Sequence, residues 1–169
     1  MWNDTDTPLA YLISFRSYGT WLHGDDRGSI DRFHNRYGDP YLVQSEPWER
    51  HNRKKRKADP FILGAKERQS VLKAIRETCS IRKWNLRALN VRTNHVHTVV
   101  TANRKPELVL NAFKANATRQ LRQDQLWRHA FSPWAHKGSK RLLWNERSVA
   151  NAIDYVLNGQ GDDLPEFDG

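Results

Sequence analysis

The chain has 169 residues, a length that suits one domain with a buried core. Apolar residues make up 38% of it and aromatic residues 11%, which excludes a disordered chain. Its formal net charge of +9 makes a polyanion the expected partner. Cys79 is the single cysteine, which excludes an intramolecular disulfide. The sequence contains neither a signal-peptide pattern nor an apolar run of roughly 20 residues, so we expect a cytoplasmic protein.

Strand-forming and helix-forming patterns alternate in the first two thirds of the chain. Residues 10–18 predict a mostly apolar, central first strand. Residues 24–60 lack a clear period, and we interpret them as an enlarged basic insertion. Apolar residues at helical spacing predict a helix over 66–83. Two strands, 84–91 and 95–102, then follow around a tight turn.

The remaining elements complete a familiar order. Pro106 opens a helix that we expect to end near Gln123. A short strand is predicted over 140–144, and Asn145 caps a last helix that ends at Asn158. Strand, helix, strand, strand, helix, strand is the ferredoxin-like split βαβ pattern, an α+β fold with helices packed on an antiparallel sheet.

In that fold the first and third strands are antiparallel neighbours, which places Tyr18 close to His95. We expect a single domain over residues 1–169, ending in an acidic tail at 161–169.

The basic residues and the aromatic residues together favour nucleic acid as the polyanion. A basic run at residues 50–57 holds six of the 28 Lys and Arg residues. Seven Trp and five Tyr supply flat rings on which unpaired bases can stack. A short basic run can also be an ordinary solvated surface. The residues of the run that we expect to contact nucleic acid are Arg50, Arg53, Lys54, Lys55, Arg56 and Lys57.

Two histidines stand two residues apart in the third predicted strand. Side chains alternate along a strand, so His95 and His97 project from the same face. Two imidazoles placed in this way can share one divalent cation. Two hydrogen-bonded histidines on a polar face give the same pattern, so the spacing alone leaves both interpretations open.

The segment Asn94-His95-Val96-His97 resembles the His-hydrophobic-His motif of HUH endonucleases. It is similar to the motif of the single-tyrosine transposases of insertion sequences and of REP-associated tyrosine transposases. The predicted elements, including a closing Tyr-Val-Leu-Asn segment at 155–158, follow the family's order over about residues 10–160. The resemblance implies single-stranded or hairpin DNA as partner and Mg²⁺ or Mn²⁺ as cofactor. It also implies cleavage by a tyrosine that becomes joined to the 5′ phosphate, followed by strand transfer.

The resemblance also implies a Lys-X-X-Tyr motif in the second helix, where this chain has Lys114 and then Ala117. We expect Tyr18 to be the substitute nucleophile, because the topology brings it near the histidines; a metal-activated water is the alternative. Tyr155 matches a family position that we interpret as structural. Lys114 would lie near the reacting phosphate, and Gln120 would be the third metal ligand.

Several assignments stay open at this point. Asn116 is the alternative to Gln120 as ligand, and the missing tyrosine allows a catalytically inactive relative that binds DNA or RNA. A generic ferredoxin-like RNA binder is less favoured, because its aromatic signature is missing from the paired strands. Monomer and homodimer fit equally, and we expect association with the nucleoid. Four further basic residues could contact the DNA backbone: Arg92, Lys137, Lys140 and Arg141.

Overall fold

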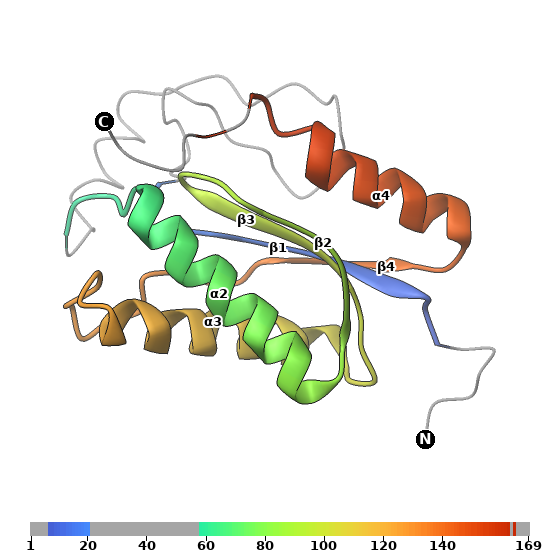
Figure 1. Ribbon diagram of the computed structural model, residues 1–169, viewed down its shortest axis with the longest axis horizontal. Helices are drawn as coiled ribbons and strands as arrows, with labels where there is room; N and C mark the ends of the chain where they lie inside the picture. Colours follow the sequence, from blue (N-terminus) through green and yellow to red (C-terminus); the bar gives the residue numbers. More distant parts are fainter. Residues whose placement is uncertain (1–6, 21–57, 163, 165–169) are drawn as a thin grey trace.

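The computed structural model describes residues 7–20, 58–162 and 164 (Figure 1). Each predicted element in these ranges is confirmed to within two residues at its ends. Of the basic insertion predicted at 24–60, all but residues 58–60 lies outside the described residues. No helix in the described ranges has the length and hydropathy to cross a membrane. The elements are β1 (Ala10–Arg16), α2 (Ala65–Arg82), β2 (Asn85–Val91), β3 (His95–Thr101), α3 (Pro106–Gln123), β4 (Ser139–Leu143) and α4 (Glu146–Asn158).

The four strands form one antiparallel sheet in the order β2-β3-β1-β4, which is the predicted ferredoxin-like order. In the central pair, Arg16 of β1 lies opposite His95 of β3, and Ser14 lies opposite His97. The end of β1 is therefore next to the start of β3, as predicted from the topology.

Helices cover both faces of this sheet. Figure 1 shows α2 and α3 on one face and α4 on the other. Tyr11, Ile13 and Phe15 of β1 point into the larger core beneath α2 and α3, whereas Ala10 and Leu12 point into a smaller core beneath α4. The alternation of strand side chains thus directs the buried residues of β1 to one helix layer and the other in turn.

Local sequence signals set the helix ends. The Asn145 side chain caps α4 by accepting a 2.8 Å hydrogen bond from the amide of Ser148. Pro106 occupies the first turn of α3, where a missing N–H costs nothing. α2 ends at Lys83, which takes the left-handed conformation (φ 59°) and donates its amide back to the last turn. These signals fix where α4 and α3 begin, and hence which residues each presents to the sheet.

Candidate active site

His95 and His97 lie on the face of β3 that α4 covers. Val96, between them, points the opposite way into the larger core. The two imidazole centroids are 4.7 Å apart, with the rings inclined at 67°. His97 is 8% exposed and His95 is half-buried. The prediction that the two histidines share one face is confirmed.

Each imidazole is held through its Nδ1 atom. Nδ1 of His97 lies 2.5 Å from Oγ of Ser14, its cross-strand neighbour. Nδ1 of His95 lies 2.6 Å from Oδ1 of Asn94. When each Nδ1 donates to its oxygen, each Nε2 is left with a lone pair. Metal-ligating histidines are oriented by outer partners in the same way.

Gln160, just beyond α4, brings an amide oxygen to the pair. Its Nε2 donates to the carbonyl of Tyr155 at 2.9 Å, which fixes the orientation of the amide. Its Oε1 then faces Nε2 of His95 at 3.2 Å. The hydrogen-bonding influence of the same side chain also acts to raise the pKa of His97. Two imidazoles and one amide oxygen therefore lie together beneath α4.

His95 faces an oxygen acceptor at each ring nitrogen, Asn94 at Nδ1 and Gln160 at Nε2. A neutral imidazole has one N–H and can satisfy only one of them. The imidazolium could satisfy both. However, burial, reinforced by the charges of Arg16 and Arg92 and opposed by the Gln160 hydrogen bond, lowers the pKa of His95 to about 4.

Burial likewise lowers the pKa of His97 to about 3, with His95 and Arg16 adding to the effect. Both rings are thus neutral at physiological pH, the form that coordinates a metal. A divalent cation placed between the Nε2 atoms of the two histidines and Oε1 of Gln160 would accept their lone pairs. Once Nδ1 of His95 donates to Asn94, its Nε2 and Oε1 of Gln160 face each other as two acceptors. The donor set fits such an ion. Within the described ranges no three His, Cys, Asp or Glu side chains form a metal-binding group, and the oxygen that faces Nε2 of His95 belongs to the amide of Gln160.

The amide predicted to complete this set, Gln120, is on the other side of the sheet. Its Nε2 donates to the Asp124 carboxylate at 3.1 and 3.0 Å. With Asn116 it lines a groove of about 240 Å³ between α2 and α3. The sheet separates both amides from His95 and His97, so neither can join the histidines within one chain. The structure corrects this prediction because α3 covers the face opposite the histidine pair.

The two α3 positions assigned to the reaction are also on that opposite face. Ala117 is fully buried in the larger core, so a side chain at this position lies beneath the sheet. Lys114 Nζ donates to the carbonyl of Ala135 at 3.0 Å and to that of Lys137. Burial lowers the pKa of Lys114, and the charge of Lys140 adds to this effect. Lys114 ties the loop before β4 to α3 and does not lie near the histidines.

Tyr18, the expected substitute nucleophile, points into a group of aromatic rings. Its centroid is 4.9 Å from that of Phe131 and 6.5 Å from that of Trp127. These rings belong to or border the larger core. The backbone of Tyr18 is near the start of β3 as predicted, but its ring turns away from the histidine pair.

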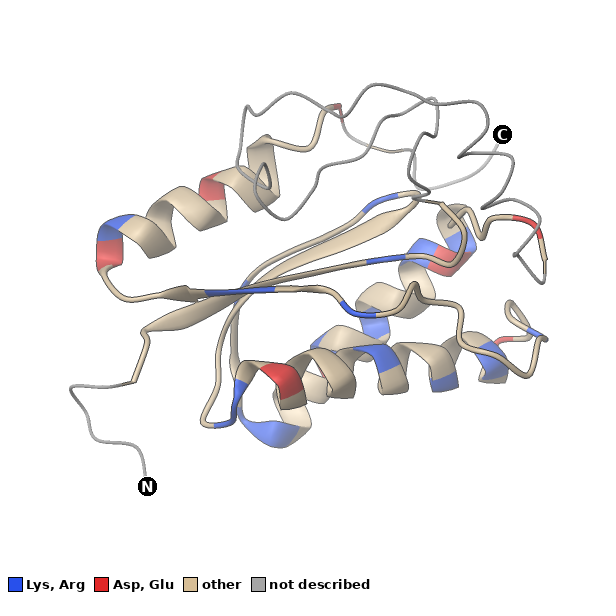
Figure 2. Ribbon diagram, turned by 180° about the vertical axis from the view of Figure 1, so that it is seen from behind, with Lys and Arg blue, Asp and Glu red and all other residues tan. Residues whose placement is uncertain are grey.

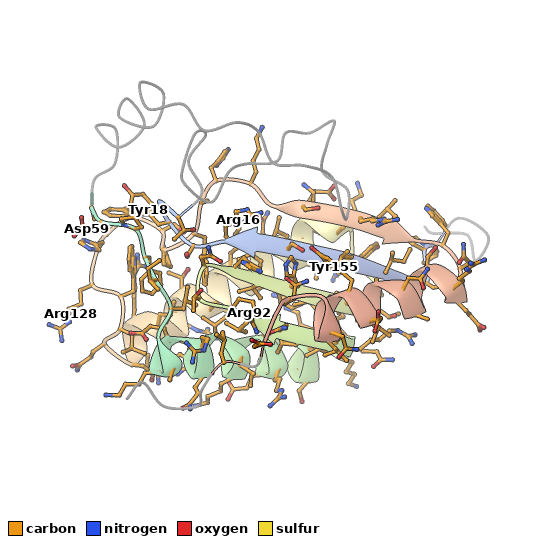
Figure 3. All side chains as sticks on the ribbon, turned by 90° about the horizontal axis from the view of Figure 1, so that it is seen from above. Arg16, Tyr18, Asp59, Arg92, Arg128 and Tyr155 are labelled. Carbon is orange, nitrogen blue, oxygen red and sulfur yellow. The ribbon has the colours of Figure 1, made fainter. Side chains whose placement is uncertain are left out.

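The tyrosine that lies against the histidines is Tyr155 of α4. Its ring centroid is 5.4 Å from that of His97, with the planes inclined at 68°. Figure 3 shows Tyr155 beside α4 in the same region as Arg16 and Arg92, well away from Tyr18. The structural role predicted for Tyr155 therefore did not include its contact with His97. The sequence signal that could have identified Tyr155 is the Tyr-Val-Leu-Asn segment followed closely by Gln160. This segment ends the last helix, and that helix covers the face of the sheet that α2 and α3 do not cover.

Two guanidinium groups flank the histidines. The charges of Arg16 and Arg92 both act on the imidazole of His95. Nη2 of Arg92 donates to the carbonyl of Asp162, in the described part of the acidic tail, at 2.9 Å. The sequence identified Arg92 but missed Arg16, whose position opposite His95 follows from the strand register. The pair places positive charge beside the imidazole of His95.

The other predicted basic contacts are dispersed. Lys137, Lys140 and Arg141 are exposed. Arg141 lies opposite Leu12 and so shares the α4 face, whereas Lys140 lies opposite Ile13 on the α3 face. Figure 2 shows further Lys and Arg positions along α2 and α3. The run at 50–57 lies outside the described residues.

Two solved structures are similar to this chain. A REP-associated tyrosine transposase bound to a REP hairpin matches with a TM-score of 0.50 and 10% identity, over 89% of this chain and 65% of that one. The chain thus spans about two thirds of the length of this relative. A proposed transposase from Deinococcus radiodurans R1 matches with a TM-score of 0.48 and 12% identity, over 94% of this chain and 95% of that one. The first likeness establishes a shared fold.

The family follows from the sequence itself. The profile of IS200-like transposases matches residues 53–153, more than half of the chain. The chain belongs to this family, as the His95-Val96-His97 resemblance had implied. No curated protein matches it as a relative.

Proposed function

We propose that this protein cleaves single-stranded or hairpin DNA and transfers the cut strand, with Tyr155 as nucleophile. The observation that carries the proposal is the packing of the Tyr155 ring on His97, 5.4 Å between centroids, beside the convergent donors of His95 and Gln160. Membership of the IS200-like transposase family supports it. The REP hairpin bound by the structural relative and the net charge of +9 support DNA as the partner.

In this proposal His95, His97 and Gln160 hold one Mg²⁺ or Mn²⁺. The ion, when bound, polarises the scissile phosphate and stabilises charge on the departing oxygen. Arg16 and Arg92 bind the same phosphate from the side and hold it in place. Ser14 and Asn94 act one step further out, by fixing the two imidazole rings (Ser14 on His97, Asn94 on His95).

Tyr155 Oη attacks the phosphorus of the scissile phosphate and loses its proton to water. The bond from phosphorus to the 3′ oxygen breaks, and that oxygen takes up a proton and leaves as a 3′ hydroxyl. The 5′ phosphate stays joined to Tyr155. Because this ester preserves the energy of the broken bond, a second 3′ hydroxyl can displace the tyrosine and complete strand transfer without a nucleotide cofactor.

The alternative interpretation, a catalytically inactive relative that binds DNA or RNA, was based on the alanine at position 117. That position is buried in the core on the opposite face of the sheet, so its side chain says nothing about the nucleophile at the histidines. A tyrosine stands at the histidines in any case, and no observation now favours the inactive alternative.

The test uses the full chain, a labelled hairpin DNA with unpaired flanks, and Mn²⁺. We expect strand cleavage and an SDS-stable protein–DNA adduct. Tyr155→Phe should abolish the adduct, whereas Tyr18→Phe, the matched tyrosine control, should retain it. Gln160→Ala should reduce cleavage strongly, and Gln120→Ala should leave it unchanged. An adduct that survives Tyr155→Phe would overturn the assignment of the nucleophile. Hairpin binding without cleavage in any divalent metal would overturn the activity.

A further inference from the structure

Five aromatic rings gather where β1 ends and β3 begins; we call them the aromatic cluster. It consists of Tyr18, Phe61, Trp127, His129 and Phe131. His129 stacks on Phe131 with 4.9 Å between centroids and only 20° between planes, and Phe131 lies 4.9 Å from Tyr18. Trp127 contacts Phe61 at 4.7 Å and His129 at 4.8 Å. The rings form a short ladder, and the proposed reaction uses none of them.

The ladder runs from the core to the surface. Trp127, at its base, is 6% exposed, and its Nε1 donates to the carbonyl of Phe131 at 2.8 Å. Tyr18, Phe61 and Phe131 are half-buried, and His129 is exposed. Burial in the core accounts for the positions of the inner rings. It does not account for the exposed imidazole of His129, which lies nearly parallel to the ring of Phe131 and so presents a flat face to solvent.

The loop that carries the outer rings is held in one conformation. Nη2 of Arg122 donates to three successive carbonyls, those of residues 129–131, at 3.2, 3.1 and 3.4 Å. The amide of Tyr18 donates to the carbonyl of Pro133 at 2.7 Å and so fixes the loop to the end of β1. A surface that is already ordered loses little entropy when it binds a flat ligand.

The aromatic cluster is within reach of a strand that occupies the histidine pair. Arg16 lies opposite His95, and Tyr18 is two residues further along. At about 3.4 Å per residue along a strand and about 5 Å between strands, the backbone of Tyr18 is roughly 8 Å from that of His95. This is roughly the span of two to three stacked nucleotides at about 3.4 Å each.

We propose that the aromatic cluster binds unpaired bases of the DNA strand that flanks the scissile phosphate, with His129 as the outer stacking ring. The inference rests on the proposed function, because the strand must first occupy the histidine pair. Aromatic rings bind unpaired bases face to face, and a neighbouring cation retains the backbone. Arg128 supplies that cation: it is exposed, adjoins His129 in the chain, and extends into solvent in Figure 3.

The experiment measures binding by fluorescence anisotropy in EDTA, so that cleavage does not contribute. One probe is a labelled hairpin with about six unpaired nucleotides on each side, a length typical of single-strand sites. The second probe has abasic residues at those unpaired positions, which removes the bases but keeps every phosphate. The proteins are the full-length wild type and His129→Ala, with His129→Trp to restore the ring and His136→Ala as a control for removing a histidine elsewhere.

We expect the wild type to bind the base-bearing probe at least about five-fold more tightly than the abasic probe. His129→Ala should lose most of that difference without weaker binding to the abasic probe, whereas His129→Trp and His136→Ala should behave as wild type. Wild-type protein that does not distinguish the probes, or His129→Ala that still does, would overturn the inference and leave the proposed function standing. Failure to bind either probe would overturn the proposed function as well.

Discussion

Ser14 is the most direct test of the proposed metal site, because its hydroxyl is the outer partner of His97. The Ser14→Ala substitution removes the oxygen 2.5 Å from Nδ1 and leaves a ring that is 8% exposed without that partner. The imidazole is then free to rotate or to change tautomer, and either change withdraws the Nε2 lone pair from the site. Loss of such an outer partner weakens metal binding by about 10- to 100-fold. This corresponds to about 1.4–2.8 kcal/mol of binding free energy.

The assay is calorimetric titration of Mn²⁺ into the metal-free full chain at pH 7.5, above the range in which either histidine protonates. Ser14→Thr keeps the hydroxyl and should bind Mn²⁺ within about three-fold of wild type, since the retained oxygen still orients the ring. Ser139→Ala removes an exposed hydroxyl from the strand position opposite Ser14 and should have no effect. Wild-type affinity in a folded Ser14→Ala protein would refute the reasoning that Ser14 orients His97 as a metal ligand.

Three further outcomes follow from the described contacts. Lys114→Ala should lower the free energy of unfolding by about 1–3 kcal/mol in urea titrations, because two carbonyls of the 135–137 loop lose their donor. It should leave the affinity for Mn²⁺ unchanged, and a large loss of that affinity would show that Lys114 acts at the active site. Cys79 is 3% exposed and burial raises the pKa of its thiol to about 11, so it should react with a thiol reagent at pH 8 only after denaturation; rapid labelling of the native protein would contradict this. Asn145→Ala should cost about 0.5–2 kcal/mol of stability through the lost cap of α4, whereas Asn145→Ser should recover most of it.

The fold was largely predictable because its signals are local. Apolar spacing over 66–83 and 106–123 predicted helices, Pro106 marked where the second begins, and Asn145 marked the cap of the last. The order of the elements then implied the sheet. Residues 24–57 carry no periodicity from which an element could be predicted, and they lie outside the described residues.

The candidate site was only half predictable. The spacing of His95 and His97 predicted a shared face, but not which helix covers it. Val96 and Val99 are both fully buried, on opposite faces of β3, so the pattern of apolar residues does not distinguish one face from the other. The crossover helices of a split βαβ fold share one face, since such connections are right-handed, which leaves the other face to the last helix. That rule points to Tyr155.

The division of the molecule into two helix layers has a consequence for its synthesis. The larger core draws on β1, α2, β2, β3 and α3, all of which leave the ribosome before α4. A growing chain can therefore fold that core and its histidine strand while Tyr155 and Gln160 are still missing. Under the proposed function, a chain interrupted before Tyr155 would compete with the complete protein for DNA without being able to cut it. Under the same proposal, the order of translation delays the capacity to cleave DNA until almost the end of the described fold has been made.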